Sequence, residues 1–509
     1  MTPDWQTLVP EVALRPVQIR ALDAIDAGFE SGSRVVLLQA PTGVGKSLIE
    51  LALCRLNEDR GSNSFVVTPQ RILQDQLGVW ERLKVMKGRA GYPCALMRGL
   101  SAATAPCTKE SRIREQHVEC SDAVCPYFKA LAEAKASPTV VCNYAGILAQ
   151  SRIAKHFDRR GLLCLDEGHT AAEWTRRFAT ISIHERHFHA LSSQPVPEED
   201  EDYVPWLRST LSYLEEVPAG LPDELRSEVS KALSLSSALG LNGQDPTVPW
   251  AGTREGKVRH AVPLKVSPLS WMLTSLGSKI LVVTATVLDS RLLAAELGLS
   301  KESTTFVDLP DAFHRSRRPI VRSYIGRISM RTEQELMPRL INRLEETADK
   351  HDGEPGIIHT ISHRMADAIF EELSDRIGHR RTIVRVRKGP ERDTIIADFL
   401  SGRTGPGAIL IGPALMEGVD GAGDSCRWQA MCKVPWPNRG DPVVKHVMST
   451  TGKWAEPWYA WKAAQQSVQG FGRVCRSDDD FGTTYLMDAG FERVLSSGYV
   501  PRYVKEAVT

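Results

Sequence analysis

The 509-residue sequence lacks any apolar run that approaches the ~18 residues needed to cross a bilayer as a helix. Its first residues, MTPDWQ, lack the basic and apolar segments of a secretory signal. We therefore expect a cytoplasmic protein with no membrane partner. In that compartment the ten cysteines are expected to be thiols or metal ligands rather than disulfides.

The sequence also has almost no net charge. A formal charge of +1 provides no global field toward nucleic acid or anionic lipid, so any polyanion must be held by local patches. Hydrophobic residues make up 42% and charged residues 25%, which is ordinary for a soluble globular protein. No internal repeat or long low-complexity segment is present. At about 150 residues per domain, the length predicts about three folding units.

Short apolar runs that end in polar residues predict buried parallel strands. Helical patterns follow several of these runs, and strand–loop–helix alternation with polar strand ends is typical of doubly wound α/β folds. We therefore predict an α/β protein with two parallel-sheet domains. The predicted strands lie at residues 35–38, 64–70, 161–170 and 279–286, and within residues 355–373, 408–420 and 483–490.

The boundary between the two domains is predicted near residues 305–320. Residues 88–130 hold a cysteine cluster, and residues 172–265 are predicted to be helical and rich in loops. Because neither stretch fits the alternation, we expect both to be insertions in the first domain. The predicted division is 1–87, 131–171 and 266–309 for the first domain, 88–130 and 172–265 for its insertions, and 310–509 for the second domain.

The segment APTGVGKS fits the phosphate-loop pattern, except that Ala40 stands where the strict motif has glycine. Gly43 and Gly45 permit a turn whose backbone N–H groups face phosphate at a helix start. Lys46 is expected to neutralise the β- and γ-phosphates of ATP, and the Ser47 hydroxyl to ligate Mg²⁺. A strand before the loop and a helix after it argue against a chance glycine-rich turn. The predicted nucleotide-binding residues of the loop are Thr42, Gly43, Val44, Gly45, Lys46 and Ser47.

Two further segments predict hydrolysis of the bound nucleotide. In LCLDEGH, Asp166 suits a Mg²⁺ ligand, and Glu167 suits a group that orients or deprotonates water. In QGFGRVCR, Arg473 and Arg476 share one face if the segment is helical. From the second domain they could act as an arginine finger in cis, so that domain closure depends on ATP and reopening on hydrolysis. Two solvated surface arginines are the alternative.

Taken in order, these motifs resemble superfamily 2 helicases and, within them, the XPD/DinG family of DNA helicases. The resemblance covers most of the chain. It implies two RecA-like domains with ATP between them, and single-stranded DNA crossing both with 5′→3′ translocation. The matching segments are RPVQ (15–18) for the adenine-side motif, VVTPQRILQDQL (66–77) for motif Ia, DEGH (166–169) for a DEAH-type box, TAT (284–286) for motif III, MEGVD (416–420) for motif V and QGFGRVCR (469–476) for motif VI.

The resemblance also implies functional residues. His169 would link the ATP state to motif VI, in which Gln469 precedes the two arginines. Thr68 and Gln70 would contact the DNA strand, although Thr68 could simply terminate a strand of the sheet. Tyr144 could stack near the DNA, although a core position is an equal alternative. The further nucleotide-site residues implied are Arg15, Gln18, Gly418 and Asp420.

The cysteines of residues 88–130 predict a metal centre. KGRAGYPC (87–94) resembles the family's entry into an iron–sulfur domain, and CPYF (125–128) resembles its exit. Four thiolates are what a [4Fe–4S] cluster needs, and so polar a segment would scarcely fold without a metal. The spacing departs from the close inner cysteine pair of XPD-like members, so Zn²⁺ or free thiols remain alternatives. The predicted ligands are Cys94, Cys107, Cys120 and Cys125.

The sequence thus predicts a monomeric ATP-dependent DNA helicase with 5′→3′ polarity that acts on single-stranded and forked DNA. In the family the cysteine domain lies where the duplex splits, so both insertions are expected to frame a hole for the strand. One alternative is a DNA-stimulated translocase that remodels protein–DNA complexes without unwinding. Another is an ATP-switched nucleic-acid-binding protein. The basic run at 376–388 is expected either to contact phosphate or to form a solvated face.

Overall fold

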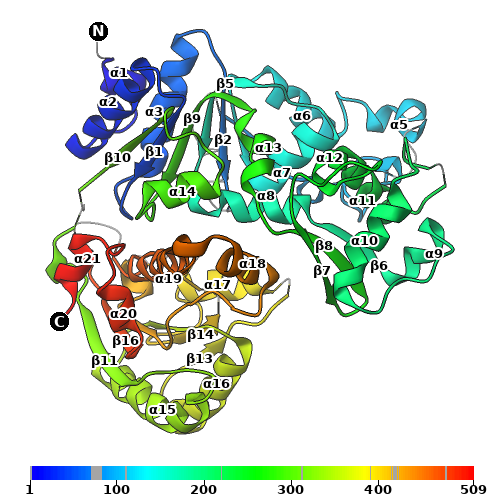
Figure 1. Cartoon of the computed structure of the whole chain (residues 1–509). Coiled ribbons are helices and arrows are strands. Elements are labelled where there is room, and N and C mark those ends of the chain that lie inside the picture. Colours follow the sequence, from blue (N-terminus) through cyan, green and yellow to red (C-terminus); the bar gives the residue numbers. More distant parts are fainter. Residues whose placement is uncertain are drawn as a thin grey trace.

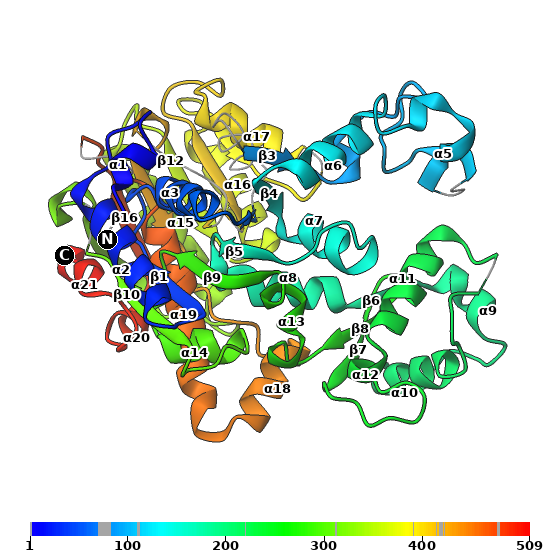
Figure 2. The same ribbon diagram turned by 90° about the horizontal axis from the view of Figure 1, so that it is seen from above.

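The computed structural model describes residues 3–69, 83–108, 112–218, 220–310, 313–389, 391–413, 415–416, 421, 423–475 and 479–509. Two α/β domains lie one above the other (Figure 1). Figure 2 shows two smaller lobes, one around α5 and one around α9–α12, that project from the same side of the first domain. Among the described residues, no helix is both long and apolar enough to cross a bilayer.

Domain 1 is built on a seven-stranded sheet with the order β10–β1–β9–β5–β2–β4–β3, in which all neighbours are parallel. The predicted α/β class is therefore confirmed for this half of the chain. Its strands are β1 (Val35–Gln39), β2 (Ser64–Thr68), β3 (Leu83–Met86), β4 (Thr139–Asn143), β5 (Arg160–Leu165), β9 (Gly277–Thr284) and β10 (Thr304–Asp308).

Alternate residues of these strands are buried in two separate hydrophobic cores, one on each face of the sheet. Val36 and Leu38 of β1 pack toward α2 and α3, whereas Val35 and Leu37 pack toward the helices of the opposite face. Because both faces are covered, the strands read as continuous apolar runs. The helices of domain 1 are α1 (Trp5–Leu8), α2 (Pro16–Glu30), α3 (Lys46–Asp59), α6 (Pro126–Ala136), α7 (Tyr144–Leu148), α8 (Ala171–Ala179), α13 (Trp271–Thr274) and α14 (Ser290–Glu296).

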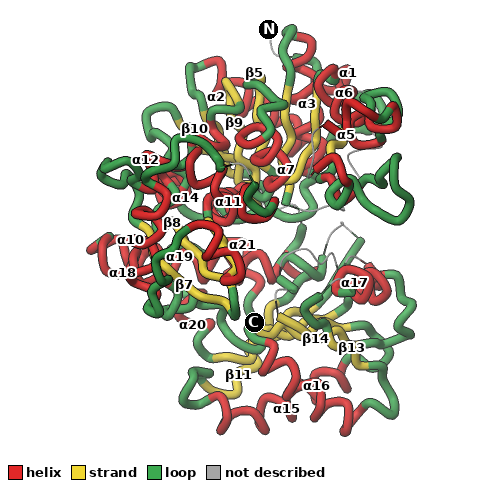
Figure 3. Tube along the Cα trace, turned by 90° about the vertical axis from the view of Figure 1, so that its right-hand side faces the viewer, coloured by secondary structure: helices red, strands yellow, loops and turns green. Residues whose placement is uncertain are grey.

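Domain 2 contains a six-stranded parallel sheet with the order β11–β16–β15–β12–β14–β13. Figures 1 and 3 show α15 and α16 on the side away from domain 1, and Figure 1 shows α19 on the side that faces it. The strands are β11 (Ile320–Gly326), β12 (Gly356–Thr360), β13 (Ile383–Arg385), β14 (Ile409–Pro413), β15 (Trp428–Met431) and β16 (Thr483–Asp488). The helices are α15 (Glu333–Lys350), α16 (His363–Ile377), α17 (Arg392–Leu400), α18 (Pro442–Thr450), α19 (Ala455–Phe471), α20 (Phe491–Leu495) and α21 (Arg502–Ala507).

The lobe around α5 (Arg112–Gln116), here called the cysteine lobe, connects β3 to α6. Apart from α5 it consists mainly of short helical turns and loops. Phe128, Leu131 and Ala134 of α6 are buried in the core of domain 1. The predicted boundary at residue 130 therefore falls inside a helix that belongs to domain 1. The boundary at residue 172 likewise falls inside α8, whose Ala172 and Ala179 join the same core.

The second lobe differs from the helical insertion expected from sequence. Besides α9 (Phe188–Leu191), α10 (Asp200–Leu211), α11 (Asp223–Ser234) and α12 (Ser236–Leu239), it contains an antiparallel sheet with the order β6–β8–β7. Its strands are β6 (Ile181–His184), β7 (Trp250–Glu255) and β8 (Val258–Pro263).

This sheet was not predicted from the sequence because one of its strands, β8, contains a buried charged residue. The side chains of β8 alternate between buried and half-buried, and Arg259 occupies a buried position. Its guanidinium donates to the carbonyls of Pro197 (3.0 Å) and Glu199 (2.9 Å) and lies over the ring of Tyr203. An arginine at a core position breaks the apolar alternation by which strands are recognised.

Candidate nucleotide site at the domain interface

The phosphate loop connects β1 to α3, as predicted. Gly43 (φ 83°) and Gly45 (φ 85°) have left-handed backbones, and α3 begins at Lys46 directly after Gly45. A Cβ atom on Gly45 would lie 2.4 Å from Nε2 of Gln18, so both its conformation and its close contact require glycine. The loop therefore presents a helix N-terminus of the kind that binds phosphate.

Arg15 and Gln18 hold this loop from α2. Nη1 of Arg15 donates to the Gly43 carbonyl at 3.0 Å, and Nε2 of Gln18 donates to the Val44 carbonyl at 2.8 Å. Oε1 of Gln18 accepts from the backbone N–H of Arg15 at 2.8 Å, so the two residues also fix each other. Two residues predicted at the nucleotide site thus lie against the phosphate loop.

Lys46 and Glu167 form an ion pair, with Nζ of Lys46 3.1 Å from Oε1 of Glu167. Glu167 adopts a left-handed backbone with φ 45°, which is uncommon for a residue other than glycine. This conformation occurs where β5 ends, directly after Asp166. The strand end thereby aims an acidic side chain at the phosphate loop, and such backbone strain is often found at functional sites.

The other carboxylate oxygen of Glu167 faces domain 2. Nε2 of Gln469 in α19 donates to it at 2.9 Å, and Nδ1 of His169 lies 3.4 Å from it. Burial raises the pKa of Glu167, but Lys46, His169 and Arg473 outweigh this effect and lower the pKa to about 2. Glu167 is therefore ionised at neutral pH in a largely buried position.

Asp166 is held by several short contacts. Its Oδ2 accepts from the Thr68 hydroxyl at 3.0 Å, its Oδ1 accepts from the Glu167 backbone N–H at 2.9 Å, and its carbonyl accepts from the Tyr144 hydroxyl at 2.9 Å. Burial and the neighbouring Glu167 carboxylate raise the pKa of Asp166 to about 6, against the opposing effects of Lys46 and Thr68.

Thr68 and Tyr144 therefore lie behind the nucleotide site. Both side chains are fully buried, and the ring of Tyr144 stacks on Trp174. This placement matches the alternatives of a strand end for Thr68 and a core position for Tyr144. It gives no support to the strand contacts that the family resemblance implied for them.

Arg473 lies at the same interface. Its side chain is buried, Nε donates to the Met416 carbonyl at 2.7 Å, and its charge contributes to lowering the pKa of Glu167. The described part of motif VI is therefore close to the phosphate-loop lysine. Four predicted site residues lie outside the described part of the chain; they are Gln70, Gly418, Asp420 and Arg476.

One face of α19 donates three hydrogen bonds to domain 1. Trp461 Nε1 donates to the Val287 carbonyl and Gln465 Nε2 to the Thr286 carbonyl, both at 2.9 Å, in addition to the contact of Gln469. The three donors are four residues apart, which places them on one helical face. Sequence analysis missed Trp461 and Gln465, although their spacing from Gln469 is a signal that could have found them.

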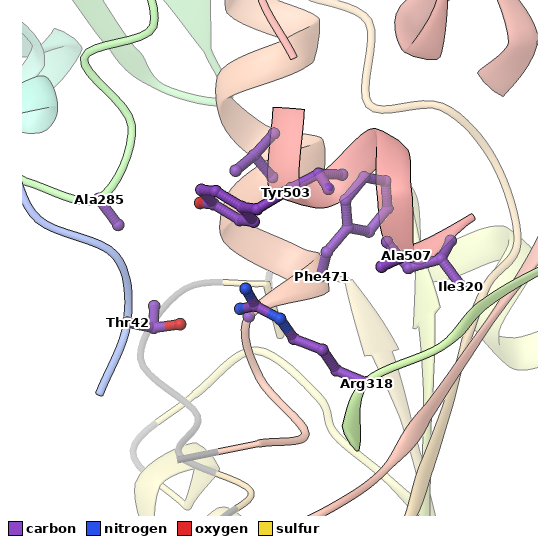
Figure 4. Close-up of a pocket in the computed structure, with 10 residues that line it drawn as sticks. Thr42, Ala285, Arg318, Ile320, Phe471, Tyr503 and Ala507 are labelled. Carbon is purple, nitrogen blue, oxygen red and sulfur yellow. The ribbon is translucent and has the colours of Figure 1, made fainter. Parts of the chain in front are cut away.

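Figure 4 shows a small pocket beside this helix, between the two domains. Thr42 and Ala285 line it from domain 1, opposite Phe471 of α19 and Arg318 and Tyr503 from the second half of the chain. The guanidinium of Arg318 lies over the ring of Tyr503 at 4.8 Å. The predicted nucleotide residue Thr42 therefore faces the opposite domain.

The oxygen donors of Ser47 and Asp166 fit Mg²⁺, which prefers one or two protein ligands together with phosphate and water. Ser47 follows Lys46 at the start of α3, and Asp166 terminates the strand β5 on which α3 packs. Within the described ranges, no three His, Cys, Asp or Glu side chains are already arranged as a complete metal site.

The four predicted cysteine ligands gather in the cysteine lobe. Burial, followed by the thiols of Cys107, Cys125 and Cys94, raises the pKa of the Cys120 thiol, and Cys107 forms a hydrogen bond with it. Sγ of Cys94 accepts from the Met97 backbone N–H at 3.4 Å. Four neighbouring sulfur donors suit iron–sulfur clusters or zinc, although their described positions do not form a finished site.

The basic run at 376–388 is largely engaged within domain 2. Arg381 is buried and donates to the Gly407 carbonyl at 2.8 Å. Three other arginines form ion pairs, which favours a structural role over phosphate contact. The pairs are Arg376 with Glu345 (3.2 Å), Arg380 with Asp349 (2.9 Å) and Arg385 with Asp367 (2.8 Å).

Two regions of the chain match known domain families. Residues 345–507 match the helicase C-terminal domain, and residues 11–189 match the res subunit of type III restriction enzymes. No curated protein matches the chain. Among solved structures, an XPD helicase has a TM-score of 0.62 at 18% identity, covering 97% of this chain and 98% of its own. Xpd4 of S. tokodaii has a TM-score of 0.60 at 13% identity, with 97% and 99% covered.

Proposed function

Because this chain has the fold of the XPD helicases, we propose that it is an ATP-driven helicase that moves on single-stranded DNA with 5′→3′ polarity. A single observation carries the proposal. Glu167 contacts Lys46 of the phosphate loop and Gln469 of the opposite domain with its two oxygens. Because Glu167 contacts both domains, a movement of domain 2 would change the orientation of the carboxylate that is proposed to activate water.

In this proposal, Lys46 changes partner when ATP binds. The triphosphate attracts Lys46 away from Glu167, and Oε1 of Glu167 becomes free to accept a proton from the attacking water. With Lys46 in contact, Lys46, His169 and Arg473 lower the pKa of Glu167 to about 2, so the carboxylate is ionised at neutral pH before ATP binds. Ser47 and Asp166 would hold Mg²⁺, which supplies positive charge to the phosphate oxygens when bound.

Domain 2 supplies the remaining groups. Gln469 orients Glu167, and Arg473, with Arg476 beyond it in motif VI, would stabilise negative charge on the transferred phosphoryl group. His169 connects Glu167 to the motif III segment, since its Nδ1 lies 2.8 Å from the Thr284 hydroxyl. Release of phosphate after hydrolysis would remove the negative charge that Arg473 and Arg476 are proposed to stabilise, so the domains would separate after each cycle.

Single-stranded and forked DNA are the proposed substrates of a monomeric enzyme. Support comes from the XPD-like fold and from the two lobes that project on the same side of domain 1 (Figure 2). In the cysteine lobe, Cys94, Cys107, Cys120 and Cys125 would hold a [4Fe–4S] cluster, with Zn²⁺ as the alternative. The cluster would fold the lobe, because its short turns leave it without a large apolar core.

The test uses forked duplexes with either a 5′ or a 3′ tail. Wild-type protein should hydrolyse ATP faster with single-stranded DNA and should separate only the fork with the 5′ tail. Lys46→Ala should abolish both activities, whereas the exposed Lys301→Ala should retain them. Hydrolysis without strand separation would favour a translocase instead. A Lys46→Ala protein that retains wild-type hydrolysis would contradict the proposed site.

A further inference from the structure

Glu50 is a buried acid with no assigned role near the nucleotide site. Its side chain is 1% exposed, and its Oε1 atom has no hydrogen-bond partner among the described residues. Leaving a buried carboxyl oxygen without a partner is costly, so the burial of this acid requires an explanation. Its neighbours Ile49 and Leu51 are buried in the apolar core of domain 1.

The position of Glu50 on α3 directs it toward the predicted Mg²⁺ ligands. It lies three residues after Ser47 and four after Lys46, so all three share one face of the helix. This helix packs on β5, which ends directly before Asp166, and Cys54 one turn later forms a hydrogen bond with Cys164 of β5. Glu50 is therefore placed between the start of α3 and the end of β5.

Electrostatics agree with this placement. Burial first, and then the Asp166 carboxylate, raise the pKa of Glu50 well above its usual range. Glu167 contributes in the same direction, whereas Lys46 opposes it. Three carboxyl groups therefore share one buried region, and Lys46 is the cation that opposes the rise in the pKa of Glu50.

We propose that Glu50 is a third carboxyl group of the divalent-cation site, where it accepts a hydrogen bond from a water molecule on Mg²⁺ held by Ser47 and Asp166. This inference rests on the proposed function, because it deepens the assignment of the same site. Contact through water fits the described geometry, in which the three carboxyl groups are not arranged to hold a metal directly. Such outer partners orient the direct ligands and tune the affinity for the metal.

The test measures Mn²⁺ as a paramagnetic probe for Mg²⁺, bound to the full-length protein in the presence of ADP. Glu50→Leu removes both acceptor oxygens and should weaken Mn²⁺ affinity by about 10- to 100-fold. Affinity for ADP without metal should not change, because Glu50 does not contact the nucleotide in this proposal. Asp59→Leu is the matched control, since Asp59 is an exposed acid on the same helix.

Glu50→Leu separates a metal role from a structural one. It removes the unpartnered oxygen, so the metal-free protein should be at least as stable as wild type while Mn²⁺ affinity falls. Glu50 variants that change thermal stability but bind Mn²⁺ within twofold of wild type would overturn the inference. If wild type binds Mn²⁺ and ADP but unwinds no DNA, only the proposed function fails. If wild type binds no Mn²⁺ with ADP, both fail.

Discussion

Nε2 of Gln469 lies 2.9 Å from Oε2 of Glu167, so one hydrogen bond connects domain 2 to an acidic residue at the phosphate loop. Oε1 of Gln469 is buried without a partner, which leaves this donor contact as the described role of the amide. The geometry makes the orientation of Glu167 depend on α19. Movement of domain 2 would therefore change the environment of the proposed base.

Gln469→Leu should lower kcat for ATP hydrolysis at least tenfold with little change in KM. A hydrogen bond to a charged group contributes about 1.5–3 kcal/mol, and here the charge belongs to the proposed base. Gln469→Glu should be worse, because two carboxylates would face each other. Steady-state hydrolysis checks this, with exposed Gln466→Leu on the same helix as control. Equal kcat in Gln469→Leu and wild type would show that the contact is unimportant for the reaction.

Gly472→Ala should impair hydrolysis by separating the domains. A Cβ atom at Gly472 would lie 2.7 Å from Oγ1 and 3.0 Å from Cγ2 of Thr42 in the phosphate loop. Its φ of −82° permits alanine, so the expected defect comes from the contact and not from the backbone. Adding Thr42→Ala removes both clashing atoms and should restore part of the hydrolysis rate of the single Gly472→Ala variant. A double variant as slow as Gly472→Ala alone would argue against a steric cause.

Cys120→Ala should remove metal and destabilise the cysteine lobe. Cys120 is the thiol whose pKa is raised by burial and by the other three cysteines of the lobe. Metal analysis and visible absorption of freshly purified protein should show bound iron in wild type and its loss in the variant. Cys142→Ala is the control, because Cys142 is buried in β4 within the core of domain 1. Stoichiometric zinc in place of iron would support the alternative metal.

The stability of domain 2 should fall as pH decreases from about 6.5 toward 4. His359 is buried; burial lowers its pKa from 6.5 to about 4, and Arg473 acts in the same direction against its bond with Gln429. Between these values the unfolded chain binds the proton more readily than the folded chain, so the free energy of unfolding decreases as the pH falls. His359→Gln should reduce this dependence in urea unfolding, and the exposed His189→Gln should not. Identical pH profiles for His359→Gln and wild type would assign the dependence to other groups.

The nucleotide loop and the main sheet could be predicted because local sequence determines them. Residues 35–38 are apolar because both faces of β1 are covered, and Gly45 is required by its left-handed backbone. Asp166 and Glu167 follow β5 directly, as the polar end of that apolar run predicted, and their catalytic roles stay predictions. The resemblance to XPD-like helicases, drawn from the order of such motifs, is confirmed at the level of the fold.

Contacts between distant segments could not be predicted in this way. Thr68 and Tyr144 are residue types that occur both in cores and at nucleic-acid surfaces, and only tertiary structure places their hydroxyls on Asp166. The strand β8 could not be recognised because it buries Arg259, whose guanidinium contacts carbonyls and the Asp200 carboxylate that are distant in sequence. Glu50 reads as one acid on an amphipathic helix, and its burial comes from segments distant in sequence that pack on α3.

The three donors on α19 can all face domain 1 only if the number of residues between them is kept. Each residue advances an α-helix by about 100°, so inserting or deleting one residue between Trp461 and Gln469 would turn the first donor away from Val287 while the last still faced Glu167. A substitution at one of the three positions removes one contact, whereas a change in length prevents the three donors from facing domain 1 at the same time. The segment should therefore tolerate exchange of its outward side chains far better than any change in its length.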